Sequence, residues 1–232
     1  MSNIIKLLPK KKKTKIGVLI QARMTSKRFP GKVLHNLWGK PVLQHVIERA
    51  GQIRGGKDQN PEVLAVIVPD TDESEPILEL ATKLGVTNFC GSENNVLERY
   101  YHAAIHFHLD VIVRITADCV VLNPRVSSEV LQLLLWRKLD YVSNVHPKRT
   151  YPAGLDTECF TMDCLEAAYK LAETDYDKEH VTPWMQREDR LQKACVTQAK
   201  NKSHQNWCVD YLEDIARLES MMIATPKILV SV

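Results

Sequence analysis

Short apolar runs alternate with helical patterns along most of this chain, and this alternation limits the fold more than any other feature. Runs typical of buried strands occupy residues 16–20, 63–68, 86–89, 111–115 and 140–142. Segments with helical spacing lie between or beside them, at residues 43–50, 75–84, 94–107 and 131–137. The alternation predicts an α/β fold with a doubly wound, mostly parallel sheet and helices on both faces. Ligands of such sheets bind beyond the carboxyl ends of the strands, so function is expected in the loops that follow them.

The alternation stops after Asn144, where residues 146–158 form a segment that contains proline and glycine. We expect helical structure again around Leu165, strands around Val196 and Trp207, and a closing helix over residues 212–222. No repeat or low-complexity linker divides the chain. We therefore expect residues 16–232 to form a single domain, preceded by a basic, disordered extension at residues 1–15.

Charge and hydropathy exclude several classes of protein. The formal net charge of the 232 residues is +3, but six lysines and no acid lie in residues 1–15, so the remainder is slightly acidic. We expect no nucleic-acid partner for a slightly acidic domain of this kind. No stretch approaches the roughly 20 apolar residues of a membrane-spanning helix, so we expect no membrane insertion and a cytoplasmic location. Assembly as a homodimer is left open.

The six cysteines are scattered, with no C-x-x-C pair. That spacing argues against a structural zinc site and against a disulfide framework in a chain of this size. We expect reduced thiols, most of them buried.

A basic loop at residues 21–32 follows the first predicted strand and contains Arg23, Arg28 and Lys32. Arg23 could grip phosphate oxygens with its planar guanidinium, Lys32 could add a point charge, and backbone amides near Ala22 could close the site. The loop therefore predicts a polyphosphate site, although basic loops also occur on ordinary surfaces. It is not a Walker loop, because the G-x-x-x-x-G-K-[ST] pattern is absent.

Two aspartates follow predicted strands. Asp118 follows residues 111–115 in the sequence Thr116-Ala117-Asp118, and Asp210 follows the predicted strand around Trp207. Two carboxylates at one edge of a sheet could hold Mg²⁺, which prefers oxygen ligands. Each aspartate, taken singly, is equally well explained as a helix N-cap.

A series of short motifs in a fixed order carries a resemblance to a known family. The motifs are Ile20-Gln21-Ala22-Arg23, Pro30-Gly31-Lys32, Gly39-Lys40-Pro41, Gly91-Ser92-Glu93, Val96-Leu97, Arg99-Tyr100, Arg114-Ile115-Thr116-Ala117-Asp118, Tyr151-Pro152, Gly154-Leu155-Asp156, Glu179-His180-Val181-Thr182-Pro183 and Val209-Asp210. Over about residues 16–220 the chain resembles the spore-coat polysaccharide cytidylyltransferase family, which is similar to the acylneuraminate and 3-deoxy-manno-octulosonate cytidylyltransferases. It departs from the usual pattern at Val120, Val121, Ala153 and Leu212.

The resemblance implies a nucleotide-diphospho-sugar transferase fold, CTP as donor, a sugar as acceptor and Mg²⁺ as cofactor. The implied catalytic residues are Arg23, Lys32, Asp118 and Asp210, the two aspartates being the metal ligands. The implied nucleotide-binding residues are Gln21, Ala22, Arg23, Lys32, Gly91, Ser92, Arg99, Thr116 and Asp118. The residues implied to bind the acceptor are Arg114, Tyr151, Gly154, Asp156, Glu158, Glu179 and His180.

The implied reaction is attack by an acceptor hydroxyl on the α-phosphorus of CTP, with release of pyrophosphate. Positioning and charge neutralisation dominate such transfers; His180 is a candidate base by residue type alone. Two alternatives stay open. The Asp70-Thr71-Asp72 sequence could belong to a metal-dependent glycosyltransferase, although acids before a helix are also explained by capping. The chain could instead be a sugar-1-phosphate nucleotidylyltransferase that uses another nucleotide.

Overall fold

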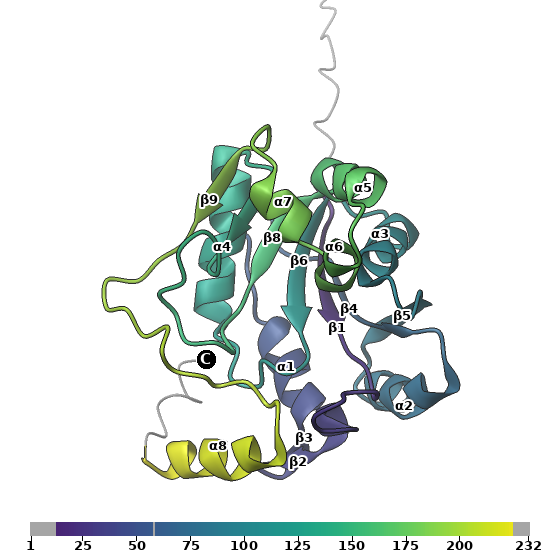
Figure 1. The fold of residues 1–232 in the computed structure, drawn as a ribbon, viewed down its shortest axis with the longest axis vertical. Coiled ribbons are helices and arrows are strands. Elements are labelled where there is room, and N and C mark those ends of the chain that lie inside the picture. Colours follow the sequence, from purple (N-terminus) through teal and green to yellow (C-terminus); the bar gives the residue numbers. More distant parts are fainter. Residues whose placement is uncertain (1–12, 58, 225–232) are drawn as a thin grey trace, which may run out of the picture.

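The computed structural model describes residues 13–57 and 59–224, so most of the predicted basic extension lies outside the described residues. Within them, seven strands form one sheet in the order β5-β4-β1-β6-β8-β7-β9 (Figure 1). These strands are β1 (Ile16–Gln21), β4 (Val63–Pro69), β5 (Thr87–Gly91), β6 (Val111–Thr116), β7 (Tyr141–Ser143), β8 (Glu158–Thr161) and β9 (Lys193–Cys195). Strands β5, β4, β1 and β6 are mutually parallel, which confirms the predicted doubly wound sheet.

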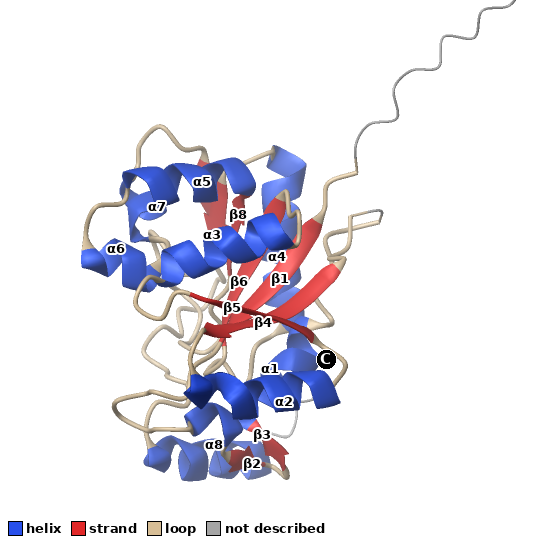
Figure 2. Cartoon of the chain, turned by 90° about the vertical axis from the view of Figure 1, so that its right-hand side faces the viewer, coloured by secondary structure: helices blue, strands red, loops and turns tan. Residues whose placement is uncertain are grey.

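Helices cover both faces of this sheet (Figure 2). One face packs against α1 (Val42–Ala50), α2 (Glu75–Lys83) and α4 (Pro124–Arg137). The other packs against α3 (Val96–His106), α5 (Met162–Leu171) and α7 (Pro183–Arg187), with α6 (Asp175–His180) beside α3 and α7. The 3-10 turns η1 (Lys32–Leu34) and η2 (Asp72–Ser74), the small hairpin of β2 (Asn36–Leu37) and β3 (Lys40–Pro41), and α8 (Leu212–Ala224) complete the described fold.

The side-chain alternation of β1 explains why the sheet needs two helical layers. Val18 and Ile20 pack into the cluster that contains α1, α2 and α4, whereas Leu19 packs into the cluster that contains α3 and α5. All three are essentially inaccessible to solvent. Successive residues of a strand point to opposite faces, so a continuous apolar run requires cover on both sides.

The third apolar cluster lies beyond the carboxyl ends of the central strands. It joins Leu37 of the small hairpin, Val120 and Val121 of the loop after β6, Val209, and Leu218 of α8. The loop that carries Asp118 and the segment that carries Asp210 are therefore anchored in one core. In the part of the chain that is described, no helix has the length and apolar composition needed to cross a membrane.

The structure corrects the sequence prediction in its second half. Strand β8 was not predicted; it enters between β6 and β7 and runs antiparallel to both. The strand predicted around Val196 ends at Cys195, and the one around Trp207 is absent, since that region makes only an isolated bridge between Ala153 and Asn206. Helix α4 begins at Pro124, well before the predicted residue 131, because the side chain of Asn123 caps it.

Candidate active site

Lys32 joins the two aspartates at the carboxyl ends of the strands. It begins the turn η1 after the loop from β1 and is only 9% exposed. Its Nζ donates to Asp118 Oδ2 at 3.0 Å, to Asp210 Oδ1 at 2.9 Å and to the Val209 carbonyl at 2.7 Å. The sequence predicted these three residues separately, in three distant segments. The structure brings them together as one charged group.

The charges in this group stabilise one another. Burial lowers the pKa of Lys32, but attraction to Asp118 and hydrogen bonds with both aspartates outweigh it and hold that pKa above its ordinary value. For Asp118 the opposing effects also leave the charged form favoured. Burial raises the pKa of Asp118, but the Lys32 charge and the hydrogen bond from Thr116 outweigh it and hold that pKa below its ordinary value. Lys32 is therefore cationic and Asp118 anionic at neutral pH.

Backbone and side-chain bonds fix both carboxylates. The Thr116 hydroxyl donates to Asp118 Oδ1 at 2.6 Å, and the Val209 amide donates to the Asp118 carbonyl at 3.1 Å. The Asp210 amide donates to Asp214 at the start of α8. The capping alternative is wrong for Asp118, because Asn123 caps the helix that follows it. The side chain of Asp210 accepts from Lys32 and pairs with Arg28.

Arg28 is a member of the group that the sequence did not assign to the site. Its Nη2 lies 2.7 Å from Asp210 Oδ1, and its guanidinium lies 5.1 Å from the centre of the Tyr211 ring. The charge of Asp210 raises the pKa of Arg28. Only its position in the basic loop pointed to it, because the partner lies 182 residues further along the chain.

The basic loop also carries Arg23, whose charge acts on Arg99 of α3. Arg23 is exposed, whereas Arg99 is 2% exposed and donates to the carbonyls of Ser92 and Glu93 at 2.6–3.1 Å. Burial lowers the pKa of Arg99 to about 10, and the Arg23 charge contributes to the decrease. The exposed Arg23 is suited to an anionic ligand, whereas the Arg99 guanidinium is bonded to the backbone of Ser92 and Glu93.

The remaining predicted nucleotide residues lie at the same edge but differ in what they offer. Gly91 packs closely against Arg99, since a Cβ there would lie 3.0 Å from the Arg99 side chain. The Ala22 amide donates to the Ile67 carbonyl at 3.1 Å, so it is already bonded, and the prediction that amides near Ala22 close a phosphate site stays a prediction for its neighbours. Gln21 Oε1 is buried and accepts no hydrogen bond within the described chain. Gln21 therefore has an unused acceptor.

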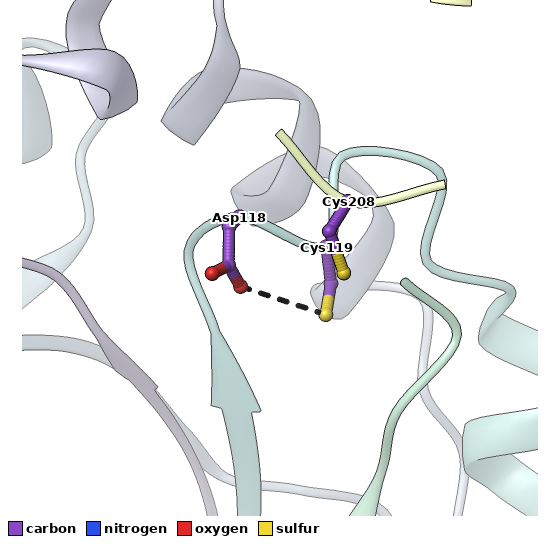
Figure 3. Close-up of side chains that lie close together, drawn as sticks. All are labelled: Asp118, Cys119 and Cys208. Carbon is purple, nitrogen blue, oxygen red and sulfur yellow. Dashed lines mark hydrogen bonds between the residues drawn. The ribbon is translucent and has the colours of Figure 1, made fainter. Parts of the chain in front are cut away.

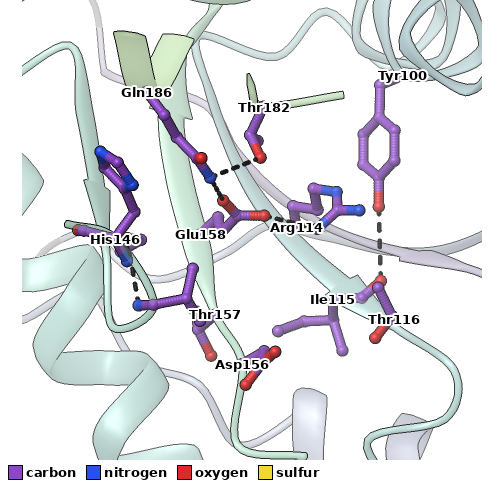
Figure 4. A network of polar contacts seen from close by, with 12 residues as sticks. Tyr100, Arg114, Ile115, Thr116, His146, Asp156, Thr157, Glu158, Thr182 and Gln186 are labelled. Carbon is purple, nitrogen blue, oxygen red and sulfur yellow. Dashed lines mark hydrogen bonds and ion pairs between the residues drawn. The ribbon is translucent and has the colours of Figure 1, made fainter. Parts of the chain in front are cut away.

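Arg114 and Glu158, both predicted to bind the acceptor, pair with each other inside the sheet (Figure 4). Arg114 Nη1 donates to Glu158 Oε2 at 2.6 Å across β6 and β8, and the Tyr141 hydroxyl donates to Glu158 Oε1 at 2.5 Å. Gln186 of α7 reaches the same carboxylate at 3.3 Å. These hydrogen bonds connect β6, β7, β8 and α7, so the network stabilises the fold.

The segment that leads into β8 supplies the other predicted acceptor residues. Arg149 makes a two-pronged contact with Asp156, at 2.6 and 2.9 Å. Tyr151 is buried in the third apolar cluster. Gly154 has φ of +98°, and a Cβ there would lie 2.7 Å from the Trp207 carbonyl carbon. Gly154 therefore lets this segment lie directly against the one that carries Asp210.

Glu179 and His180 lie apart from this group. Both are exposed on α6, where the His180 ring packs against Tyr176. Within the described residues, no hydrogen bond or ion pair joins either side chain to Lys32, Asp118 or Asp210. The geometry therefore gives no support to His180 as the base.

The Asp70-Thr71-Asp72 sequence leads into η2, which begins at Asp72. Asp72 and Glu73 occupy its first turn, and hydrogen bonds with its own backbone and with Thr71 lower the pKa of Glu73. Acids in a first turn complement the helix dipole, but neither η2 nor α2 has a side-chain hydrogen bond from its N-cap residue, so the capping part of the alternative is not confirmed. Among the described residues, the potential metal ligands that lie close together are at Asp118 and do not include Asp70 or Asp72.

Comparison with known proteins decides the family. A sequence model described as "Cytidylyltransferase" matches residues 17–225. The chain belongs to the cytidylyltransferase family. The spore coat polysaccharide biosynthesis protein SpsF of Bacillus subtilis is 31% identical to this family member, over 79% of this chain and 75% of that protein. A 3-deoxy-manno-octulosonate cytidylyltransferase of Geobacter metallireducens is 31% identical over 52% of this chain and 45% of that enzyme.

Solved structures give the same fold for this cytidylyltransferase family member. A cytidylyltransferase from Leptospira borgpetersenii superposes with a TM-score of 0.80 at 27% identity, covering 93% of this chain and 97% of that one. A CMP-2-keto-3-deoxy-manno-octonic acid synthetase complexed with CTP superposes with a TM-score of 0.69 at 16% identity, covering 91% and 99%. The nucleotide-diphospho-sugar transferase fold implied by the sequence is confirmed.

The donor set at the site fits a hard divalent cation. Asp118 and Asp210 each accept a hydrogen bond from the Lys32 ammonium, so their carboxylate oxygens already face one positive charge. The carboxylate side chains are 27% and 21% exposed, so they can be reached from solvent. Mg²⁺ is commonly held by one or two carboxylates together with waters and substrate phosphates.

Proposed function

We propose that this cytidylyltransferase family member transfers CMP from CTP to a hydroxyl of an acidic keto-sugar and releases pyrophosphate, with Mg²⁺ held by Asp118 and Asp210. One observation carries the proposal: Lys32 Nζ lies 3.0 and 2.9 Å from the two carboxylates at the carboxyl ends of the strands. Ligands of this class of sheet bind at that edge. The family match supports the nucleotide class.

The chain's own residues account for the main requirements of the transfer. Lys32 keeps the two carboxylates in place, and Arg23, Arg28 and Arg99 provide positive charge for a triphosphate at the loop edge. Bound Mg²⁺ would neutralise charge on the phosphate oxygens. Little covalent chemistry is required of the protein in such a reaction, because positioning and electrostatics supply most of the rate increase.

The acceptor class rests on the relatives and on one part of the molecule. Two related proteins are named for octulosonate sugars, which carry a carboxylate. The segment before β8 offers Lys148, which is exposed, and Arg149, which is half-buried beside Asp156. A sugar carboxylate could meet either cation. The use of sugar 1-phosphates with another nucleotide is the competing proposal.

The metal assignment is tested with Asp118→Asn and Asp210→Asn. We expect each to lower magnesium-dependent pyrophosphate release from CTP at least about 100-fold, since an amide is a poor replacement for an anionic ligand. Circular dichroism should show that both variants stay folded. Asp72→Asn is the matched control, and its rate should equal that of the wild type. Wild-type rates from Asp118→Asn would refute the assignment, and a loss confined to Asp72→Asn would favour the glycosyltransferase.

The substrate class is tested by offering CTP, ATP, GTP and UTP with acidic keto-sugars, neutral sugars and sugar 1-phosphates. We expect pyrophosphate release with CTP and an acidic keto-sugar, and a product that retains CMP by mass spectrometry. A site that hydrogen-bonds the base discriminates strongly, because the wrong base leaves buried polar groups unpaired. Efficient coupling of a sugar 1-phosphate to UTP would replace the proposal with the competing one.

A further inference from the structure

Two thiols lie beside Asp118, although the sequence separates them by 89 positions. Cys119 Sγ, Cys208 Sγ and a carboxylate oxygen of Asp118 all lie within 4.8 Å of one another (Figure 3). Cys119 is buried and Cys208 is half-buried. The absence of a C-x-x-C pair argued against a zinc site from local spacing alone, and the structure brings the ligands together from two distant segments.

The backbone holds these three residues in place. The Val209 amide donates to the Asp118 carbonyl at 3.1 Å, and this bond sets Cys208 next to Cys119. The Cys208 amide donates to the Asn206 side chain at 2.9 Å, and Arg217 of α8 donates to the Cys208 carbonyl at 3.2 Å. The cluster is thus fixed by the same contacts that bring Asp210 to Lys32.

The distances suit a tetrahedral thiolate site. Zinc–sulfur bonds of about 2.3 Å and zinc–oxygen bonds of about 2.0–2.2 Å place the ligand atoms of a tetrahedron roughly 3.5–3.8 Å apart. Cys119 Sγ lies 3.8 Å from Asp118 Oδ1. Three protein ligands leave the fourth position for water or a substrate oxygen, as in zinc sites that are open to solvent.

The Thr116 hydroxyl adds an outer contact. It lies 2.6 Å from Asp118 Oδ1 and 3.2 Å from Cys119 Sγ. Outer hydrogen bonds of this kind orient metal ligands. Asp118 also offers its other oxygen, Oδ2, to Lys32, so one carboxylate faces both groups.

We propose that Asp118, Cys119 and Cys208 form a binding site for a thiophilic divalent cation of the zinc type, and that its occupation inhibits the enzyme. Thiolates select such ions over Mg²⁺, which prefers oxygen. Each thiol releases its proton to solvent as its sulfur bonds the metal. The inhibitory role rests on the proposed function, since it requires Asp118 to serve the nucleotide reaction; the binding site does not.

Binding is tested with the full-length protein and Zn²⁺, by competition with a chromophoric chelator in the presence of a phosphine reductant that keeps the thiols reduced. We expect one strongly bound equivalent, and Co²⁺ in its place should give the near-ultraviolet absorption of thiolate–cobalt charge transfer. Loss of an outer partner alone costs about 10–100-fold in metal affinity, so Cys208→Ser should weaken Zn²⁺ binding at least about 100-fold.

Cys90→Ser is the matched control, because Cys90 is also half-buried but lies on β5 at the far edge of the sheet. It should bind Zn²⁺ as the wild type does. Equal Zn²⁺ affinity in the wild type and Cys208→Ser, or cobalt spectra without a charge-transfer band, would overturn the site.

Inhibition is tested separately, by titrating Zn²⁺ into the CTP reaction at saturating Mg²⁺. The concentration for half-inhibition should rise at least about 100-fold in Cys208→Ser, in proportion to the loss of binding. Binding without inhibition would retain the site and overturn its inhibitory role. A protein that binds Zn²⁺ at these ligands but has no activity with CTP would refute the proposed function and leave the binding site standing.

Discussion

The charged side chain of Lys32 is mostly buried, with 11% of it exposed to solvent. Removing it leaves two carboxylates and the Val209 carbonyl without their shared donor. Hydrogen bonds to charged groups contribute about 1.5–3 kcal/mol. We expect Lys32→Met to lower the free energy of unfolding by about 2–3 kcal/mol at pH 7, measured by urea denaturation, and to lower turnover strongly. Arg28→Met, which removes an exposed partner of Asp210, should cost much less, because solvent screens exposed ion pairs.

The cost of Lys32→Met should depend on pH. The pKa of Asp118 is lowered in the folded protein, so its ion pair contributes above the unfolded pKa of about 3.9 and is lost as pH falls through the folded value. The pKa of Lys32 is raised, so its contribution is complete below about 10.4 and is lost as pH rises through the folded value. The difference in stability between wild type and Lys32→Met should therefore be constant from about pH 5 to pH 9 and shrink below pH 3.9. An unchanged difference at pH 3 would contradict this.

The sequence predicted Lys32, Asp118 and Asp210 because each follows a strand or a recognisable motif. Arg28 and Cys208 could not be assigned in the same way, because their partners Asp210 and Cys119 lie far away in the chain. Gly154 was predicted as an acceptor contact, yet its φ of +98° and its contact with Trp207 give it a structural reason of its own. Residue type suggests chemistry, whereas tertiary contact decides what each residue meets.

At the scale of elements, two segments without a shared strand hold Asp210 in the site. Ala153 and Asn206 form an isolated bridge, and the Trp207 amide donates to the Ala153 carbonyl at 2.7 Å. A Cβ on Gly154 would push these segments apart. We expect Gly154→Ala to cost about 1–3 kcal/mol in unfolding free energy and to lower turnover.

Gly56→Ala is the control for that variant. Gly56 also has a positive φ, of +122°, but a Cβ there meets nothing within 4 Å. It should show backbone strain without loss of turnover. If both variants keep wild-type activity, the contact between Gly154 and Trp207 does not position Asp210.

Arg114 and Glu158 tie β8 into the sheet. Removing one member of a buried pair leaves an uncompensated charge and costs about 3–5 kcal/mol. We expect a loss of that size in Glu158→Leu by chemical denaturation, because Arg114 is 13% exposed at its side chain and has a buried Nε without a partner in the described chain. The double variant Arg114→Met with Glu158→Leu should recover most of the loss. Strictly additive losses would show that the pair contributes no coupling.

The sequence predicted most central elements because apolar runs and helical spacing mark them clearly. Strand β8 was not recognised, since it has only four residues and begins with Glu158 in a segment after proline and glycine. Its charge is tolerated inside the sheet because Arg114 faces it. The predicted strand around Trp207 reflects apolar content that packs in the third cluster without strand pairing. Local pattern cannot predict such compensation by a distant residue.

At the scale of the whole molecule, one sheet belongs to the cores on both of its faces. The first apolar cluster takes Val18 and the second takes Leu19 from the same strand. Because both clusters use side chains of the same strands, loss of packing in one cluster disrupts the sheet and therefore the other cluster. We expect one cooperative unfolding transition, with coincident denaturation curves from circular dichroism and from the fluorescence of the four tryptophans. Separate midpoints would contradict this expectation.

The order in which the chain is made also bears on the site. Lys32 and Asp118 precede Asp210 in the sequence, and Asp210 follows 92 positions after Asp118. At synthesis rates of roughly 5–20 residues per second, the second carboxylate arrives on the order of 5–20 s after the first. During that interval the nascent chain can pair its central strands, but its lysine has only one of its two anions. The growing polypeptide therefore forms its central sheet before the proposed active site is complete, and we expect activity only after the segment around Val209 docks.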